Sequence, residues 1–147
     1  MKNILIAVEL KDQAFNQQII QAAQQLAICF KAKCWIIHIA APEPDFVGYE
    51  VGPQYIRDVQ AEDLREDHRS LQKIASELEK AGISAEALLI QGPTEEMILK
   101  EVEKLNIDLV VLGNKKHSNF YSTFIGSVTD DLVQDLDIPI YLIPKKQ

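Results

Sequence analysis

Two short stretches in the C-terminal third of the sequence carry residue types that suit an anion. Gly113 ends an apolar run, and Gly126-Ser127-Val128-Thr129 stands further on, where a helical pattern begins. Glycine lets the main chain approach a phosphate, free N–H groups at a helix N-terminus point at it, and hydroxyl groups can donate to it. Lys115 and Lys116 add positive charge. The spacing predicts an anion pocket; a simple helix cap beside a solvated loop is the alternative.

Short apolar runs alternate with segments of helical periodicity along the chain. Five runs are predicted to be strands buried on both faces, because they are rich in β-favouring residues: Ile4–Val8, Trp35–Ala40, a run within Ile83–Ile90, Asp108–Gly113 and Ile138–Ile143. Apolar residues three or four positions apart predict four helices between them: Asp12–Lys31, about Gln54–Lys80, a segment from Gly92 to Leu105, and Gly126–Leu136. Asp12 is the expected N-cap of the first helix.

This alternation predicts the α/β class, with residues 1–147 forming a single domain. Strands joined by helices form a parallel sheet with helices on both faces, and five such strands fit the doubly wound order 3-2-1-4-5. Ligands of such sheets bind beyond the carboxyl ends of the strands, where the order reverses. That point lies between the first and fourth strands, so we expect the site at Ala7–Leu10 and Leu112–Val128.

Composition narrows the class of function. The chain has 147 residues, with 15 basic and 22 acidic side chains and a net charge of −7, which argues against nonspecific binding to nucleic acid or an anionic membrane. No apolar run approaches the roughly 18 residues that a membrane span needs, and the N-terminal run meets Glu9 too early for a signal peptide. Cys29 and Cys34 have no matching Cys/His partner set, so we interpret them as buried thiols of a cytoplasmic protein, with a disulfide or metal pair as the alternative.

Along essentially its whole length, the sequence resembles the universal stress protein family. Ile4–Glu9 is similar to the family's first strand, which usually ends in Asp, and Ile37–Ile39 is similar to its second strand. Gly92–Glu96 matches the turn into the third helix. The resemblance implies the adenine nucleotide alpha hydrolase-like fold.

The nucleotide motif of the family is incomplete in this chain. Gly113 and Gly126-Ser127 stand at the family's spacing, but Lys116 replaces the middle glycine. Two outcomes are open: the lysine side chain closes part of the pocket that glycine would leave free, or it points outward or meets a phosphate as a charge. Glu9 is one methylene longer than the usual Asp, which can shift metal coordination or crowd the ribose.

In nucleotide-binding members, the resemblance implies a role for each matching segment. The end of the first strand and Ile39 would line the adenine, and Glu9 would stand near the ribose. Gly113 would let the ribose and α-phosphate approach, and the start of the last helix would bind the phosphates. The implied ligand is ATP or AMP, with or without Mg²⁺. The expected site residues are Ala7, Val8, Glu9, Ile39, Leu112, Gly113, Asn114, Lys116, Gly126, Ser127 and Val128.

The fifth strand is a predicted edge of the sheet, and an uncovered apolar edge is prone to pairing. The resemblance implies that this strand pairs antiparallel across a two-fold axis, which gives a homodimer. The expected interface residues are Ile140, Tyr141, Leu142 and Ile143. A monomer whose edge is guarded by Pro139 and Pro144 is the alternative.

Two functions are weighed against each other. The first is a stress-linked regulatory or interaction protein that binds an adenine nucleotide, with at most slow ATP hydrolysis, because no general base or arginine finger is evident. The second is a dimeric interaction module of the same family without a ligand. A phospho-acceptor receiver is disfavoured because Gln91-Gly92, not Asp, follows the third strand, and a flavodoxin because Glu9–Gln13 contains no hydroxyl-rich phosphate loop.

Overall fold

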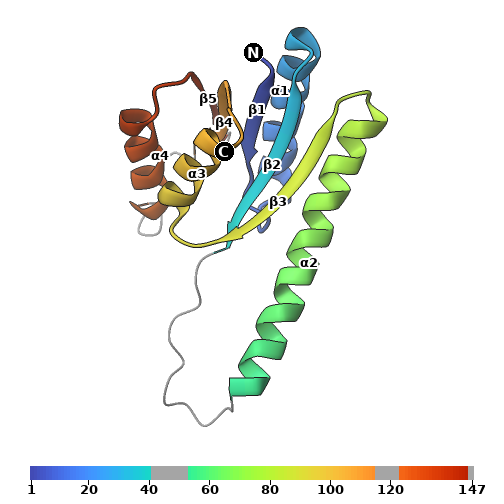
Figure 1. Ribbon diagram of the computed structural model, residues 1–147, viewed down its shortest axis with the longest axis vertical. Coiled ribbons are helices and arrows are strands. Elements are labelled where there is room, and N and C mark those ends of the chain that lie inside the picture. The colour runs from blue at the N-terminus through green and yellow to red at the C-terminus, as the bar shows by residue number, and fades with distance from the viewer. Residues whose placement is uncertain (41–52, 115–122, 146–147) are drawn as a thin grey trace.

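The computed structural model describes residues 1–40, 53–114 and 123–145 and has nine elements that alternate between strand and helix (Figure 1). The strands are β1 (Asn3–Ala7), β2 (Lys33–Ala40), β3 (Ala85–Gln91), β4 (Leu109–Asn114) and β5 (Ile140–Pro144). The helices are α1 (Gln13–Phe30), α2 (Pro53–Lys80), α3 (Thr94–Lys104) and α4 (Thr123–Asp135). The predicted α/β class is confirmed.

All neighbouring strands of the sheet run parallel, in the order β3-β2-β1-β4-β5. The predicted order 3-2-1-4-5 is therefore confirmed. β1 lies at the centre, where Leu5 stands opposite Trp35 of β2 and Val110 of β4. The order reverses between β1 and β4, as the doubly wound arrangement requires.

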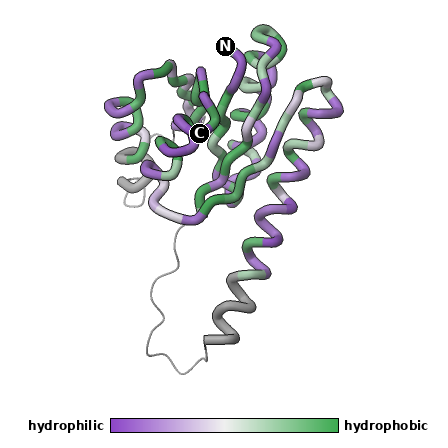
Figure 2. Tube along the Cα trace, in the orientation of Figure 1, coloured by the Kyte–Doolittle hydropathy of each residue, from purple (hydrophilic) through white to green (hydrophobic). Residues whose placement is uncertain are grey.

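A hydrophobic core covers each face of the sheet. Ile4 and Ile6 point to the face covered by α1 and α2, whereas Leu5 points to the face covered by α3 and α4. All three side chains are fully buried. Side chains alternate between the two faces of a strand, so burial on both faces requires the continuous apolar run seen in the sequence. Figure 2 shows, residue by residue, that the strands are more hydrophobic than the described part of α2.

Several predicted boundaries differ from the structure by one to three residues, and two of them concern the last helix and strand. Helix α4 begins at Thr123, three residues before the predicted start at Gly126, so Gly126 and Ser127 lie inside the helix. Glycine costs only about 1 kcal/mol inside a helix, which makes it a weak boundary signal. β5 begins at Ile140, two residues after the predicted start at Ile138. Pro139 has no N–H to donate, although its carbonyl oxygen accepts from the Val110 N–H at 3.1 Å.

Of the two thiols predicted to be buried, Cys34 is buried in β2, but the prediction was wrong for Cys29, which is exposed near the end of α1.

No helix among the described residues is long and apolar enough to cross a membrane.

The start of β1 is fixed by a carboxylate from the start of β4. Asp108 Oδ2 accepts hydrogen bonds from the main-chain N–H groups of Lys2 at 2.7 Å and Asn3 at 2.9 Å. These bonds lower the pKa of the Asp108 carboxyl group, because they favour its charged form. Asp108 therefore helps to set the register of the two central strands.

Asp108→Ala removes both hydrogen bonds, and we expect it to lower the free energy of unfolding by about 1 kcal/mol near neutral pH. Because folding lowers this pKa, the charge-dependent part of the contribution is present above the ordinary value of 3.8 and is lost as the pH falls through the lower folded value. Urea unfolding from about pH 7 to pH 3 measures the difference from wild type. Asp137→Ala, at an exposed position, is the control. A difference that does not narrow with acid would contradict the assignment.

Candidate functional site

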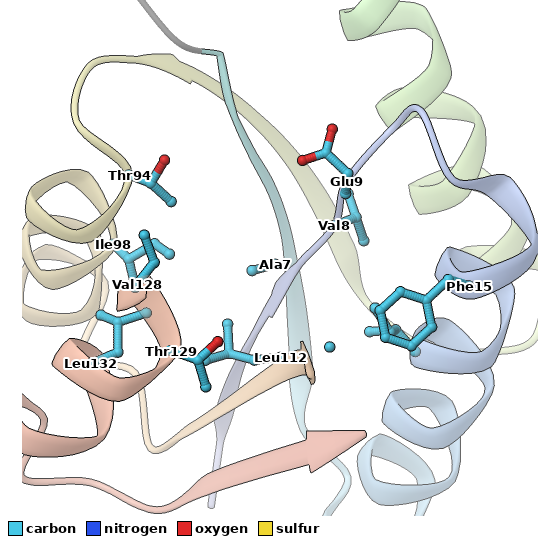
Figure 3. A pocket seen from close by; sticks show the side chains of 12 residues that line it. Ala7, Val8, Glu9, Phe15, Thr94, Ile98, Leu112, Val128, Thr129 and Leu132 are labelled. Carbon is cyan, nitrogen blue, oxygen red and sulfur yellow. The ribbon is translucent and has the colours of Figure 1, made fainter. Parts of the chain in front are cut away.

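A cavity of about 130 Å³ lies at the carboxyl ends of β1 and β4, where the strand order reverses (Figure 3). β1 and β4 form its floor, α1 borders it on one side, and α3 and α4 border it on the other. The described residues that line it are Ala7, Val8, Glu9, Phe15, Ile19, Thr94, Ile98, Leu112, Gly113, Val128, Thr129 and Leu132. The cavity therefore occurs where the topology predicts a ligand.

The cavity brings together six of the residues expected in the site. They are Ala7, Val8, Glu9, Leu112, Gly113 and Val128. Ile39 is absent from the described lining and packs against the core that α3 and α4 cover. Asn114 is also absent from the described lining: it ends β4, where its carbonyl oxygen accepts from the Lys145 N–H at 3.0 Å.

Three further expected residues are less fully described. Gly126 and Ser127 lie in α4, directly before the lining residue Val128, and the structure describes them only as part of this helix. Lys116 lies outside the described residues. Both outcomes for the lysine at the family's glycine position therefore stay predictions.

Five lining residues were not singled out by the sequence analysis: Phe15, Ile19, Thr94, Ile98 and Leu132. Most of these are apolar residues at helical spacing, a pattern that indicates a core face and carries no separate signal for a pocket. Thr94 follows the carboxyl end of β3 in the Gly92–Glu96 segment, and this position is the signal that could have placed it at the site. Thr129, which the sequence analysis placed in the anion pocket with Gly126-Ser127-Val128, lines the cavity and is buried on α4.

The walls of the cavity are mostly apolar, and the polar side chains among the lining residues are Glu9, Thr94 and Thr129. Small-molecule sites commonly combine apolar walls with a few polar groups, and enclose roughly 300–1,000 Å³. At about 130 Å³, the described cavity is smaller than that range. It suits one ring-sized group, with the remainder of a larger ligand outside the enclosed space.

An acidic group lies beside the pocket residue Thr94. A side-chain hydrogen bond with Asp135 raises the pKa of the Glu95 carboxyl group, and burial and the charges of Asp131 and Asp135 raise it further. Within residues 1–40, 53–114 and 123–145, no group of three or more His, Cys, Asp and Glu side chains is placed to hold a metal ion. These carboxylates therefore add negative charge near the α3 side of the pocket without forming a metal site.

Packing against α1 by itself requires glycine at position 113, whether or not a ligand approaches it. A Cβ atom at this position would lie 2.4 Å from Phe15 Cε1 and 2.8 Å from Ile19 Cδ1. Both contacts are closer than van der Waals packing allows. The side of Gly113 that lacks a side chain is thus occupied by α1, which lets Phe15 and Ile19 reach the sheet at the edge of the cavity.

Gly113→Ala forces the Phe15 ring to move, and we expect it to lower the free energy of unfolding by about 1–3 kcal/mol. In the double variant with Phe15→Leu, which shortens the opposing side chain, the cost of the added methyl group should fall by more than half. Urea unfolding of the two single variants, the double variant and wild type measures this coupling. Strictly additive effects would show that Gly113 and Phe15 are not in the contact described.

The comparisons with known proteins agree on one family. The model of the universal stress protein family matches residues 1–144. A universal stress protein of Thermus aquaticus is 27% identical over 144 residues, which cover 97% of this chain and 98% of that protein.

Two solved structures match the fold at low sequence identity. An Arabidopsis thaliana universal stress protein with AMP bound has a TM-score of 0.68 and 16% identity, covering 99% of this chain and 93% of that one. The universal stress protein from Archaeoglobus fulgidus in complex with dAMP has a TM-score of 0.62 and 17% identity, covering 97% and 98% of the two chains. At these identities, the likeness shows a shared fold.

Proposed function

Because the chain belongs to the universal stress protein family, we propose that it binds an adenine nucleotide in the cavity between β1 and β4 and acts as a stress-linked regulatory or interaction protein. The observation that carries the proposal is the apolar, ring-sized cavity at the switch point of the sheet. The nucleotides bound to the Arabidopsis and Archaeoglobus relatives support the choice of an adenine ligand.

Each part of the lining has a chemical role in this proposal. Ala7, Val8 and Val128 offer apolar surface to the adenine ring, whose burial supplies much of the affinity. The Glu9 carboxylate accepts hydrogen bonds from hydroxyl groups of the ribose. The phosphate lies toward the first turn of α4, where main-chain N–H groups without helical partners and the positive end of the helix dipole favour an anion. AMP or ATP, with or without Mg²⁺, meets these requirements.

We expect AMP or ATP to bind with a dissociation constant in the micromolar range, corresponding to about −8 kcal/mol. Val128→Trp places a large ring in the cavity and should weaken binding at least about tenfold by displacing the adenine. Val133→Trp is the matched control, because Val133 lies on the same helix and is 50% exposed. Isothermal titration with AMP, ADP and ATP, with and without Mg²⁺, measures both variants, and native mass spectrometry detects any nucleotide that copurifies.

The result of this titration separates the two candidate functions. If the folded wild-type protein binds none of the nucleotides, the proposal is wrong and a dimeric interaction module without a ligand is the better description. Equal weakening by Val128→Trp and Val133→Trp would place the nucleotide elsewhere on the molecule.

We also propose that β5 forms the interface of a homodimer. Within the described sheet, β5 pairs only with β4, which leaves its outer edge open. Ile140 packs inward and Ile143 is buried, whereas Tyr141 is 46% exposed and Leu142 is 37% exposed. An open strand edge with exposed apolar side chains favours pairing with a second copy, and symmetric dimers are the commonest oligomers.

Leu142→Lys places a charge in this interface and should convert the dimer to a monomer near the 16.6 kDa mass of one chain. Ile28→Lys is the control, since Ile28 is an exposed apolar residue on α1, away from β5. Sedimentation equilibrium measures the mass of each variant. A wild-type protein that is monomeric at tens of micromolar would contradict the interface.

A further inference from the structure

The main chain that leaves β1 is bound by the protein at four consecutive polar groups. The Val8 N–H donates to Ile37 O at 3.0 Å, and the Val8 carbonyl oxygen is 3.1 Å from His38 Nδ1. The Glu9 N–H donates to Asn16 Oδ1 at 3.0 Å, and Asn16 Nδ2 donates back to the Glu9 carbonyl oxygen. Both residues line the cavity. The two N–H groups are therefore already used, and a ligand that accepted from either of them would compete with an existing hydrogen bond.

The Glu9 side chain, unlike its main chain, is not held by hydrogen bonds to the described residues. Its carboxylate makes no hydrogen bond or ion pair with any residue that the structure describes. Figure 3 shows it at the edge of the pocket, across the opening from Thr94. Of the polar groups of Glu9, the carboxylate is thus the one without a partner among the described residues, and the hydrogen bonds to the main chain decide where it stands.

The residue that fixes Glu9 is itself firmly anchored. Asn16 is 6% exposed and lies on α1, which starts at the Asp12 N-cap. The Asp12 carboxylate accepts from the Phe15 N–H at 3.2 Å and pairs with Lys145 Nζ at 2.6 Å, which ties the start of α1 to the end of β5. A buried amide on an anchored helix can hold its partner in one orientation, because its own freedom is already lost.

We propose that Asn16 is a positioning residue that makes this site selective for ribose over deoxyribose. By binding both polar groups of the Glu9 main chain, the Asn16 amide aims the Glu9 carboxylate at the hydroxyl groups of the sugar. The inference rests on the proposed function, since it needs an adenine nucleotide in the cavity. It assigns to Asn16 an effect on specificity, which a purely structural role in the fold would not produce.

The test compares three ligands, AMP, 2′-deoxy-AMP and 3′-deoxy-AMP, by isothermal titration. The wild-type protein should bind at least one deoxy analogue about tenfold more weakly than AMP, because the carboxylate loses a hydroxyl partner. Asn16→Ala and Glu9→Ala should each reduce this preference to less than about threefold. In the double variant, Asn16→Ala should cause no further change, since its effect passes through Glu9. Gln17→Ala, an exposed amide one residue along α1, should keep the full preference.

A measurement on the unaltered protein covers the case in which Asn16→Ala does not fold. Hydrogen exchange followed by NMR should show that the Glu9 amide is protected before AMP is added, as a donor to a buried acceptor must be. Rapid exchange of the Glu9 amide would overturn the inference. So would an unchanged preference for AMP in folded Asn16→Ala, or a wild-type protein that binds all three ligands equally. Failure of wild type to bind AMP at all would instead overturn the proposed function.

Discussion

The central position of β1, between β2 and β4 and beneath helices on both faces, is the constraint on which the rest of the structure depends. The chain that leaves β1 enters α1 on one face, and the chain that leaves β4 leads to α4 on the other face. Right-handed crossovers send the two connections to opposite faces wherever the strand order reverses. The carboxyl ends of β1 and β4 are therefore neighbours whose chains diverge, and the cavity lies between them.

The first two turns of α1 connect several features that lie apart in the sequence. Asp12 caps the helix and pairs with Lys145 beyond β5, Phe15 packs on Gly113 of β4, and Asn16 binds the main chain of Glu9. The start of α1 thus contacts the end of β5, the end of β4 and the residues that follow β1. Movement of α1 would change the cavity, the end of β5 and the position of Glu9 together.

Most of the architecture could be predicted from the sequence, because it depends on periodicity and on the handedness of crossovers. Short apolar runs such as Ile4–Val8 predict strands buried on both faces of a sheet, and the helical periodicity of the segments between them predicts the helices that cover it. The Asp12 cap was also predictable, since its hydrogen bond is local. The ends of helices and strands are less predictable: the sequence pattern predicts a helix start at Gly126, whereas α4 begins at Thr123.

The site was predictable where it follows from topology and not where it depends on side-chain partners. The ends of β1 and β4 do meet at the cavity, but Ile39 is not among its described lining residues. Asn16 was overlooked because a polar residue in an amphipathic helix usually faces water. Its burial reflects a partner in the preceding loop, and such a contact depends on the angle at which the helix leaves the strand.

The charges around the cavity determine how an anionic ligand would have to enter it. Glu9 at the end of β1 repels a phosphate, and Glu95 with its neighbouring aspartates adds negative charge next to Thr94. The first turn of α4 is different, because the positive end of its dipole attracts an anion. A nucleotide bound as we propose would therefore be most stable with its phosphate toward α4 and its sugar hydroxyls toward Glu9. The opposite orientation would place two negative groups together at the edge of a low-dielectric pocket, where repulsion is stronger than in water.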